Sequence, residues 1–417
     1  METQPKIWRV AIPSQWAKQP EFMNIHYLLE AERCPRAVAL KRADYAELWR
    51  GKGYPDRPTQ HAVIGSLVHS TIQEIIGKLI EANCESIHDP DAVAQLKQIG
   101  GYSGVIFSRI QALLGALEGN PRMLRSKDRF AIELKSRMPQ VREQVQIMLS
   151  RLSWKLRQIA GRSSAGVEQR RGQKGKRAAL AEGAYCEVDL VDQDSMWKGF
   201  ADLIEIRKGV CAITDFKSGS RSATHDTQLL VYAWLWRSDK ERNPEQRPAT
   251  SLTLSYQQGE VEVPIPPVEK LDVVIQDLRD RTTAVRSAMA NIPPEAKVDF
   301  ATCRQCSVRL LCDEYWRKLR PSSLSTDSVS DFDDVEVMLL ERQTNRTWEA
   351  ECRVSGSVPI KGRRVLIRLS ESDFELEAEM KAGTVVRFAD SYVLPGGEDE
   401  MPTVQVTSHT EPMFVSR

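Results

Sequence analysis

The sequence has no uninterrupted apolar stretch of the roughly 18 residues that a membrane-spanning helix needs. Its opening residues, METQPKIWRVAIPSQW, also lack the basic segment, apolar core and cleavage site of a secretory signal. These absences argue against a membrane or secreted protein, and we expect the chain to act in the cytoplasm.

A phosphate-binding loop of the form G-x-x-x-x-G-K-[ST] is also missing from the sequence. We therefore expect no ATPase or helicase motor in this chain. If the protein acts on a duplex, unwinding would have to come from a partner such as a helicase.

Cysteine is sparse, since the 417 residues contain only eight, too few for a disulfide scaffold. Three of them, Cys303, Cys306 and Cys312, are clustered with the spacing C-x2-C-x5-C. Three close thiolates leave one position open in a tetrahedral metal site or a four-cysteine cluster. Cys34, directly before Pro35, is the candidate for the fourth ligand, and free thiols are a further interpretation.

The formal net charge of +1 hides an asymmetry along the chain. Residues 321–417 contain ten Lys and Arg but 18 Asp and Glu, so they carry a net charge of −8 and leave +9 for residues 1–320. A basic body suits a polyanionic partner such as nucleic acid, whereas the acidic segment by itself does not.

The length predicts about two domains. Residues 1–320 have a mainly helical pattern up to about residue 160, then a β-rich pattern, and a helical pattern again from about residue 227. Residues 321–334 are rich in Ser and Asp and are predicted to be a linker. Residues 335–417 contain short alternating segments, which predict a small all-β barrel or sandwich.

The segment MWKGFADLIEIRKGVCAITDFKSG, residues 196–219, is typical of two strands joined by a tight Lys-Gly turn. In that register Asp202 faces Asp215 with Cβ atoms about 5 Å apart, and Lys217 shares their face. Two opposed carboxylates destabilise a hairpin unless a cation lies between them. The pair therefore predicts a Mg²⁺ or Mn²⁺ site for phosphodiester chemistry. A register shifted by one residue, or acids exposed at a strand end, is the alternative.

Two helical segments carry further polar groups. Residues 62–82 have an apolar stripe at helical spacing, and Gly65 and His69 lie four residues apart on a separate polar line. The segment HDTQLLVYAWLWR places Gln228 and Tyr232 four residues apart on another predicted helix. Taken alone, each segment is more typical of an amphipathic helix with incidental polar side chains.

The segments GSLVH, GFADLIE, DFKSG and QLLVYA, in this order, resemble the RecB-type branch of the PD-(D/E)xK nuclease superfamily, whose pattern is GxxxH, GxxD, (D/E)xK and QxxxY. Each motif is weak alone, but four in the same order are specific. The resemblance covers roughly residues 25–320. It implies an α/β fold with a restriction-endonuclease-like PD-(D/E)xK core and large helical insertions.

The resemblance also assigns roles to individual residues. It implies that His69, Asp202 and Asp215 bind the metal and that the carbonyl of Phe216 adds a ligand. Lys217 would orient or activate the attacking water and stabilise charge on the phosphate.

Further roles follow from the same family pattern. Gln228 and Tyr232 would position the substrate strand. Such nucleases often carry another glutamate on the strand before the GxxD strand. Glu187 is the candidate for it, with Glu182 and Asp189 as alternatives.

One distant amino-terminal cysteine and three carboxy-terminal ones bracket the nuclease motifs. This arrangement resembles the iron–sulfur subgroup of the same branch, which includes the AddB subunit of end-resection complexes and CRISPR-associated adaptation exonucleases. The resemblance implies a structural [4Fe-4S] cluster on Cys34, Cys303, Cys306 and Cys312. A Zn²⁺ ion on the same thiolates is the alternative.

Two segments suggest contacts with partners. The Gly-rich basic segment GRSSAGVEQRRGQKGKR, residues 161–177, is suited to contacting phosphates without reading bases, or is a solvated loop. The carboxy-terminal barrel resembles an OB-fold, which commonly binds single strands, and its candidate stacking residues are Trp348, Phe374, Phe388 and Tyr392. Its acidity favours a protein-docking or autoinhibitory role equally.

These observations predict a DNA nuclease that hydrolyses phosphodiester bonds with Mg²⁺ or Mn²⁺. We expect an exonuclease that acts on single strands or frayed ends, in DNA repair or recombination, CRISPR adaptation or defence. The alternative is a non-catalytic DNA-binding or scaffold subunit of a DNA-processing complex. The set His69, Asp202, Asp215 and Lys217 weighs against it, because a scaffold has no need for opposed acids beside a lysine.

Overall fold

The computed structural model describes most of the chain, namely residues 9–10, 12–45, 54–123, 126–154, 177–319, 332–356, 358, 360–370, 373–397 and 400–415. Most of the basic segment 161–177 and of the predicted linker 321–334 lies outside these described residues.

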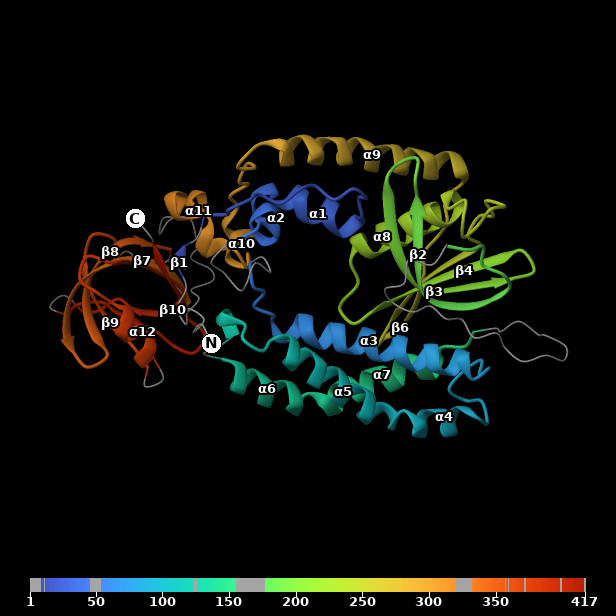
Figure 1. Cartoon of the computed structure of the whole chain (residues 1–417), viewed down its shortest axis with the longest axis horizontal. Coiled ribbons are helices and arrows are strands. Elements are labelled where there is room, and N and C mark those ends of the chain that lie inside the picture. Colours follow the sequence, from blue (N-terminus) through green and yellow to red (C-terminus); the bar gives the residue numbers. More distant parts are fainter. Residues whose placement is uncertain are drawn as a thin grey trace.

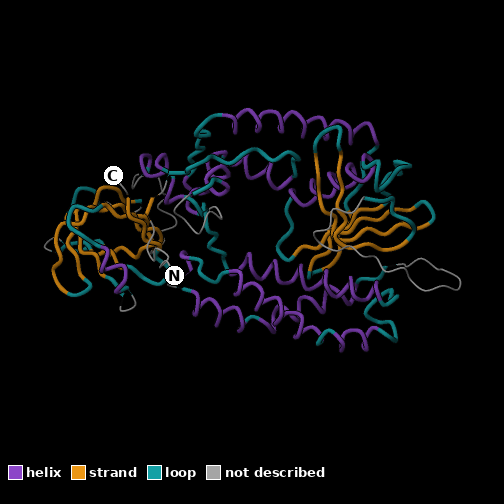
Figure 2. Tube along the Cα trace, in the orientation of Figure 1, coloured by secondary structure: helices purple, strands orange, loops and turns teal. Residues whose placement is uncertain are grey.

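A five-stranded sheet lies at the centre of the part of the chain that carries the predicted motifs (Figure 1 and Figure 2). Its order is β2-β3-β4-β5-β6, with β4 and β5 parallel and the other neighbours antiparallel. Helix α8, Ala223–Ser238, supplies the crossover that a parallel pair requires. The strands are β2 (Gly183–Asp192), β3 (Trp197–Arg207), β4 (Val210–Lys217), β5 (Ser251–Tyr256) and β6 (Gly259–Glu262).

Strands β3 and β4 form the predicted hairpin in the predicted register, in which Leu203 pairs with Thr214. Lys208 and Gly209 have φ values of 40° and 84°, the two left-handed residues of a tight type I′ turn. The two-residue turn fixes which side chains of the strands meet, so this prediction is confirmed.

Strand β2 is irregular at Glu187. The register with β3 continues on both sides of this residue but omits it, and Glu187 has a φ of 54°. Cys186 packs toward the core shared with α3, whereas Val188 packs toward the core shared with α8. Residues two apart in a regular strand share a face. The strand therefore turns over at Glu187, beside Asp202 of β3.

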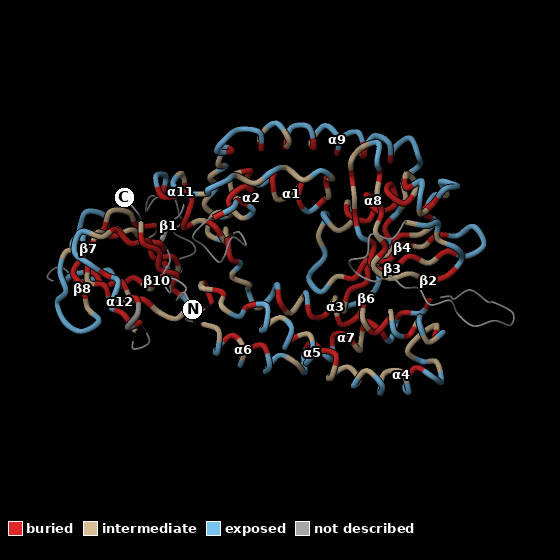
Figure 3. The backbone as a smooth tube through the Cα atoms, in the orientation of Figure 1, coloured by how far each residue is buried: buried red, intermediate tan, exposed pale blue. Residues whose placement is uncertain are grey.

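Helices cover both faces of the sheet in two layers (Figure 1). One layer contains α8, α1 (Ile25–Arg33), α2 (Pro35–Arg42) and α9 (Val268–Ala290), which share a buried core with the sheet. The other layer is a bundle built on the long helix α3, Gln60–Glu81, close to its predicted range. Buried positions concentrate where the helices face the sheet or one another (Figure 3). The other bundle helices are α4 (Ala92–Gln98), α5 (Gly101–Ala116), α6 (Lys127–Ser136) and α7 (Met138–Arg151).

The carboxy-terminal part forms a seven-stranded, barrel-like sheet, which closes because β10 pairs with β7 as well as with β11 and β12. The small all-β unit is thus present as predicted. An amino-terminal strand, β1 (Arg9–Val10), joins it by pairing in parallel with β12. Helix α12, Phe374–Glu379, lies between β9 and β10 in the chain. The remaining strands are β7 (Phe332–Thr344), β8 (Thr347–Ser355), β9 (Arg364–Arg368), β10 (Val385–Leu394), β11 (Thr403–Gln405) and β12 (Glu411–Val415).

The barrel core contains two of the four predicted stacking residues. Trp348 is 7% exposed and Phe388 is fully buried. The alternation of their strands turns these rings inward, where they pack with Val337, Ile367 and other apolar side chains. Neither ring is therefore available to a nucleobase.

The barrel contacts the cysteine-bearing segment, which contains α10 (Phe300–Arg304) and α11 (Asp313–Lys318). Arg309 lies 2.7 Å from a carboxylate oxygen of Asp334 and of Asp390. Arg387 of β10 donates a hydrogen bond of 2.9 Å to the carbonyl of Leu310. Buried apolar residues of both parts also share one core, so the two parts are packed together.

In the part of the chain that the structure describes, no helix combines the length and the apolar character needed to cross a membrane.

Candidate active site

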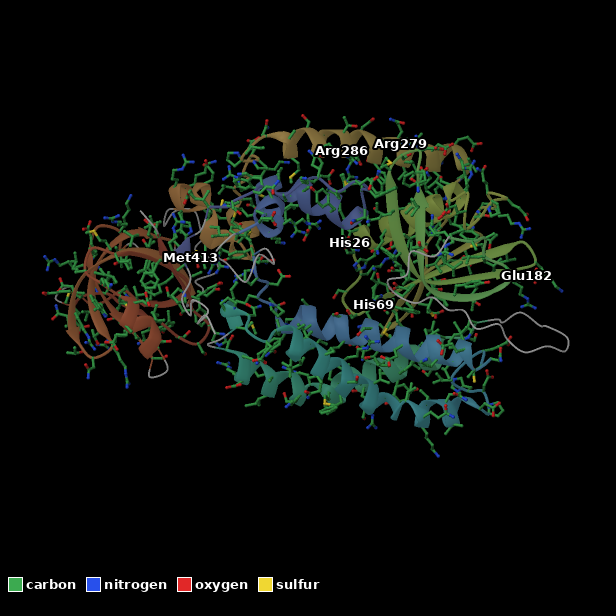
Figure 4. All side chains as sticks on the ribbon, in the orientation of Figure 1. His26, His69, Glu182, Arg279, Arg286 and Met413 are labelled. Atoms are coloured by element: carbon green, nitrogen blue, oxygen red, sulfur yellow. The ribbon has the colours of Figure 1, made fainter. Side chains whose placement is uncertain are left out.

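A cavity of about 640 Å³ lies where the sheet meets α3, α8 and the start of α1. It brings together all six predicted catalytic residues from four separate elements. They are His69, Asp202, Asp215, Lys217, Gln228 and Tyr232. Figure 4 labels His69 and shows its side chain on the sheet side of the open middle of the view, near His26 of α1.

Three oxygen and nitrogen donors gather at one end of this cavity. One ligand atom each of His69, Glu187 and Asp202 lies within 4.8 Å of the others. His69 Nε2 is 2.9 Å from Asp202 Oδ1, and the backbone N–H of Phe216 donates a hydrogen bond of 2.7 Å to Asp202 Oδ2. Two carboxylates and an imidazole from α3, β2 and β3 are suitable ligands for Mg²⁺ or Mn²⁺.

A second chain of contacts starts from Asp215. Lys217 Nζ lies 2.5 Å from Asp215 Oδ2 and donates a hydrogen bond of 2.9 Å to Gln228 Oε1. Gln228 Nε2 in turn donates to the hydroxyl of Tyr232 at 2.6 Å. The other oxygen of Asp215, Oδ1, accepts a long hydrogen bond of 3.4 Å from Gln228 Nε2, so both oxygens of this buried carboxylate face polar groups of the cavity.

The site raises the pKa values of two of its groups, the Asp215 carboxyl and the His69 imidazole. Burial and the neighbouring Asp202 carboxylate raise the pKa of Asp215 to about 6, despite the Lys217 ammonium beside it. Burial alone would lower the pKa of His69, but the hydrogen bond and the charge of Asp202 outweigh this and raise it. The carboxylate of Asp202 contributes to both shifts, and a cation bound beside it would counter its charge.

The glycines of two motifs allow close packing at the site. A Cβ on Gly65 of α3 would lie 2.7 Å from Ser218 Oγ, in the loop after Lys217. A Cβ on Gly199 of β3 would lie 2.8 Å from the ring of Tyr232. These contacts explain why the GxxxH and GxxD patterns begin with glycine, since each glycine lets a helix approach close enough to place its polar side chain.

The structure separates the three candidates for the additional glutamate. Glu187 joins His69 and Asp202. Glu182 instead accepts a hydrogen bond from the backbone N–H of Lys208, and Asp189 forms ion pairs with arginines on the other side of the strand's turning point. Asp215 lies outside the three-residue group, although the sequence favoured it as a ligand.

Sequence reasoning missed four other residues of the cavity wall, namely His26, Lys198, Phe200 and His225. Burial and the charge of Lys217 lower the pKa of both histidines. His26 reaches the site because Met23 bridges to Trp197 and thereby attaches the start of α1 to β3. No periodic pattern in the sequence indicates such a contact between distant segments.

The four predicted cluster cysteines line a different cavity of about 480 Å³, between α2 and the segment around α10. Five cations also line it, namely Arg33, Arg36, Lys41, Lys297 and Arg309. A single Zn²⁺ with Zn–S bonds of about 2.3 Å would hold its sulfurs about 3.8 Å apart. In the described residues, no three cysteine sulfurs lie within 4.8 Å of one another.

The α/β sheet, the cation-suited donor group and the adjacent lysine define a class of protein, that of metal-dependent enzymes that hydrolyse phosphate esters. Residues 27–313 match the PD-(D/E)XK nuclease superfamily. The match spans more than half of the chain, and the protein belongs to this superfamily.

Comparisons with curated proteins and with solved structures add no further relative from which an inference can be drawn. A search of curated proteins finds no match. Among solved structures, a murine DNA-binding protein bound with double-stranded DNA matches with 5% identity, over 57% of this chain and 96% of that chain, at a TM-score of 0.15. So low a score carries no inference about fold or function.

Proposed function

We propose that the protein is a DNA nuclease that depends on Mg²⁺ or Mn²⁺ and digests single strands or frayed ends as an exonuclease. The observation that carries the proposal is the convergence, in one cavity, of the donor group His69, Glu187 and Asp202 with Asp215 and Lys217. Superfamily membership supports the nuclease class, and the net charge of +9 on residues 1–320 suits a polyanionic substrate.

The donor group and Asp215 would hold the cation, and the carbonyl of Phe216 is the further ligand that the family resemblance implies. When bound, the cation would supply positive charge to the oxygens of the scissile phosphate. Asp202 is held in place by His69 and by the backbone of Phe216, so its position is set before the substrate arrives.

Lys217 is the group best placed to orient the attacking water and to stabilise charge on the phosphate. Asp215 and Gln228 hold its ammonium from two directions, which fixes the proton donors within the cavity. Tyr232 in turn fixes the Gln228 amide. Gln228 and Tyr232 thereby position both the lysine and the substrate strand beside it.

The first experiment compares linear and covalently circular single-stranded DNA as substrates with Mn²⁺, using the anaerobically purified full-length chain. We expect degradation of the linear strand alone, with chelator abolishing it. Lys217→Ala should lower the rate by about 10²–10³-fold, the cost of removing a preorganised charge donor. Lys240→Ala is the matched control, because Lys240 is exposed and paired with Asp194 outside the cavity.

Each other outcome has a definite meaning. Cleavage of the circle would indicate an endonuclease. A cleavage rate that Lys217→Ala leaves unchanged would remove the site assignment, and binding without cleavage of either strand would favour the non-catalytic subunit.

We propose further that Cys34, Cys303, Cys306 and Cys312 hold a [4Fe-4S] cluster that ties the two ends of the nuclease part together, as in the iron–sulfur subgroup. The four cysteines share one cavity with several cations, which supports a negatively charged metal–thiolate group there, and the family resemblance favours the cluster over a single Zn²⁺. Burial raises the pKa of the Cys303 thiol to about 11, so thiolates would form here only with a bound metal group.

Iron and acid-labile sulfide in the anaerobically purified protein test this proposal. We expect about four iron atoms per chain, lost in Cys306→Ser. Cys352→Ser is the control, because Cys352 lies in the barrel core and not in the cysteine cavity. Stoichiometric zinc without iron would overturn the cluster.

We propose that the barrel is an OB-fold. The order β7-β8-β9-β11-β10, closed by β10 on β7, supports it, as do the parallel pair β9 and β11 and the position of α12 after β9. The contacts of Arg387 and Arg309 favour a docking role for the barrel against the cysteine-bearing segment. The pathway, whether DNA repair or recombination, CRISPR adaptation or defence, and a helicase partner follow from the family resemblance alone.

A further inference from the structure

Phe200 stands out among the aromatic side chains near the candidate active site. It is 53% exposed, whereas the neighbouring residues Gly199, Ala201 and Asp202 are all buried. Within the described residues its ring contacts no other ring. Single exposed apolar side chains are common on protein surfaces. Phe200 differs because it lines the cavity that holds the candidate catalytic groups, where it can contact a bound ligand.

The strand geometry places this ring directly beside the catalytic carboxylate. Gly199 faces Tyr232 of α8, and Asp202 faces His69 of α3 on the other side of the sheet. Phe200 alternates with Gly199 and therefore shares the face of Asp202, about 7 Å along the strand. That separation is close to the spacing of neighbouring nucleotides in an extended single strand.

Two cationic or polar side chains flank the ring in the same cavity. Lys198, two residues before Phe200, shares its face, and its ammonium has no hydrogen-bond or ion-pair partner in the described part of the chain. His26 projects from the start of α1 and also lines the cavity, with no hydrogen bond to its imidazole among the described residues. An aromatic face between groups that can contact phosphate is the combination that sequence-tolerant single-strand binding uses.

We propose that Phe200 is a base-stacking residue, which holds the nucleobase next to the scissile phosphate while Lys198 and His26 contact the adjoining backbone. This inference rests on the proposed function and adds the subsite that fixes the register of the strand. A protein partner is a poorer occupant, because the exposed ring lies inside the cavity with the catalytic groups and not on an open apolar face.

The proposal predicts that the side chain of Phe200 is energetically coupled to one base of the bound strand. Binding is measured in the Lys217→Ala background, in which cleavage is slow. The ligands are single-stranded oligonucleotides that each contain one abasic nucleotide, at a different position counted from either end. Fluorescence anisotropy gives the Kd of each. We expect Phe200→Ala to weaken binding of the intact strand by about 5- to 100-fold, the range for loss of one base–aromatic stack.

The decisive measurement combines Phe200→Ala with an abasic nucleotide. At one abasic position, Phe200→Ala should cause no further loss, because the base that it stacks on is already missing. Phe200→Tyr should retain the affinity of Phe200, and Phe200→Leu should not, since a flat ring is required. Phe107→Ala on α5 is the control for losing an exposed phenyl group, as Phe107 is 49% exposed and outside the cavity.

Two outcomes would overturn the proposal. One is a loss from Phe200→Ala that stays the same at every abasic position, and the other is a leucine variant that binds as tightly as the phenylalanine. The proposed function fails differently: if the wild-type chain cuts no DNA but Phe200→Ala is still coupled to one abasic position, the stacking site is kept and the nuclease is lost. A chain that binds none of the oligonucleotides would lose both.

Discussion

Lys217 contacts two acceptors at once, and this limits where its ammonium can go. Asp215 and Gln228 hold the ammonium in place. Tyr232 accepts a hydrogen bond from Gln228, and Asp202 accepts one from the backbone N–H of Phe216, next to Lys217. The candidate catalytic side chains are therefore held in orientation by contacts with one another. Such mutual restraint is what allows a few side chains to act together on one phosphate.

The position of Glu187 leads to the first prediction. Glu187→Gln removes one of the carboxylates of the donor group, so Mn²⁺ should bind about 10–100-fold more weakly. Electron paramagnetic resonance titration of free Mn²⁺ measures the Kd directly. Glu182→Gln is the matched control, because Glu182 contacts the backbone of Lys208 outside the donor group. Unchanged Mn²⁺ affinity in Glu187→Gln would show that the cation sits on Asp202 and Asp215 instead.

Residue-level prediction succeeded where regular geometry decides the outcome. The two-residue turn alone gives the register that brings Asp202 and Lys217 to one end of the hairpin. Glu187 was named as the candidate through the family resemblance and not from the strand pattern, because a left-handed φ at a non-glycine residue leaves no mark in the sequence. Phe200 and His26 were missed for a different reason, since nothing in an apolar strand or a helix start indicates which side chains a distant segment leaves exposed.

At the scale of elements, the approach of α8 to β3 depends on one missing side chain. Gly199 lets the ring of Tyr232 pack directly onto the strand backbone. The ring then presents its hydroxyl to Gln228, so the packing of two elements decides the position of a catalytic contact.

The second prediction compares two glycines. Gly199→Ala would put a Cβ 2.8 Å from the Tyr232 ring and should lower the free energy of unfolding by about 1–3 kcal/mol. Gly77→Ala, in the interior of α3 with no atom within 4 Å of the added Cβ, should raise it by about 0.5–1 kcal/mol. Urea unfolding followed by far-ultraviolet circular dichroism measures both. If the two variants moved in the same direction, the close packing of Tyr232 on β3 would be refuted.

Element type was predictable where the periodicity was strong, as in α3 and the β3–β4 hairpin. The helical bundle after α3 was also expected, because apolar residues recur at helical spacing. What could not be predicted is which helices share a core. The pairing of α1 with α9 joins segments far apart in the chain, and only packing decides it.

At the scale of the whole molecule, a buried ion pair links the helical bundle to the barrel. Arg122, just after the end of α5, contacts both carboxylate oxygens of Glu411 on β12, at 2.5 and 2.8 Å. Its guanidinium also donates to the carbonyl of Ser307, next to Cys306. Bundle, barrel and cysteine-bearing segment therefore meet at one arginine.

The third prediction concerns the pH dependence of this link. Burial would raise the pKa of Glu411, but the charges of Arg122 and Arg57 outweigh it and hold the pKa below its ordinary value of 4.5. The unfolded chain thus takes up this proton at a higher pH than the folded chain, so the stabilisation is present above about pH 4.5 and is lost as the pH falls further. Glu411→Gln should lower the free energy of unfolding by about 3–5 kcal/mol at pH 7, with a smaller deficit near pH 4.

Urea unfolding of wild type and variant at both pH values, followed by tryptophan fluorescence, measures the difference. Glu245→Gln is the control, because Glu245 pairs with Arg247 in an exposed ion pair worth little. A deficit of the same size at pH 7 and pH 4 would mean that the shape of the side chain matters and its charge does not.

The pairing of β1 with β12 has a consequence for the order in which the chain folds. Arg9 lies opposite Phe414, so this pairing joins two segments that are separated by almost all of the sequence. Pairings between such distant segments form late, because a long loop must close first. We therefore expect the addition of β1 to the barrel to be among the last steps of folding.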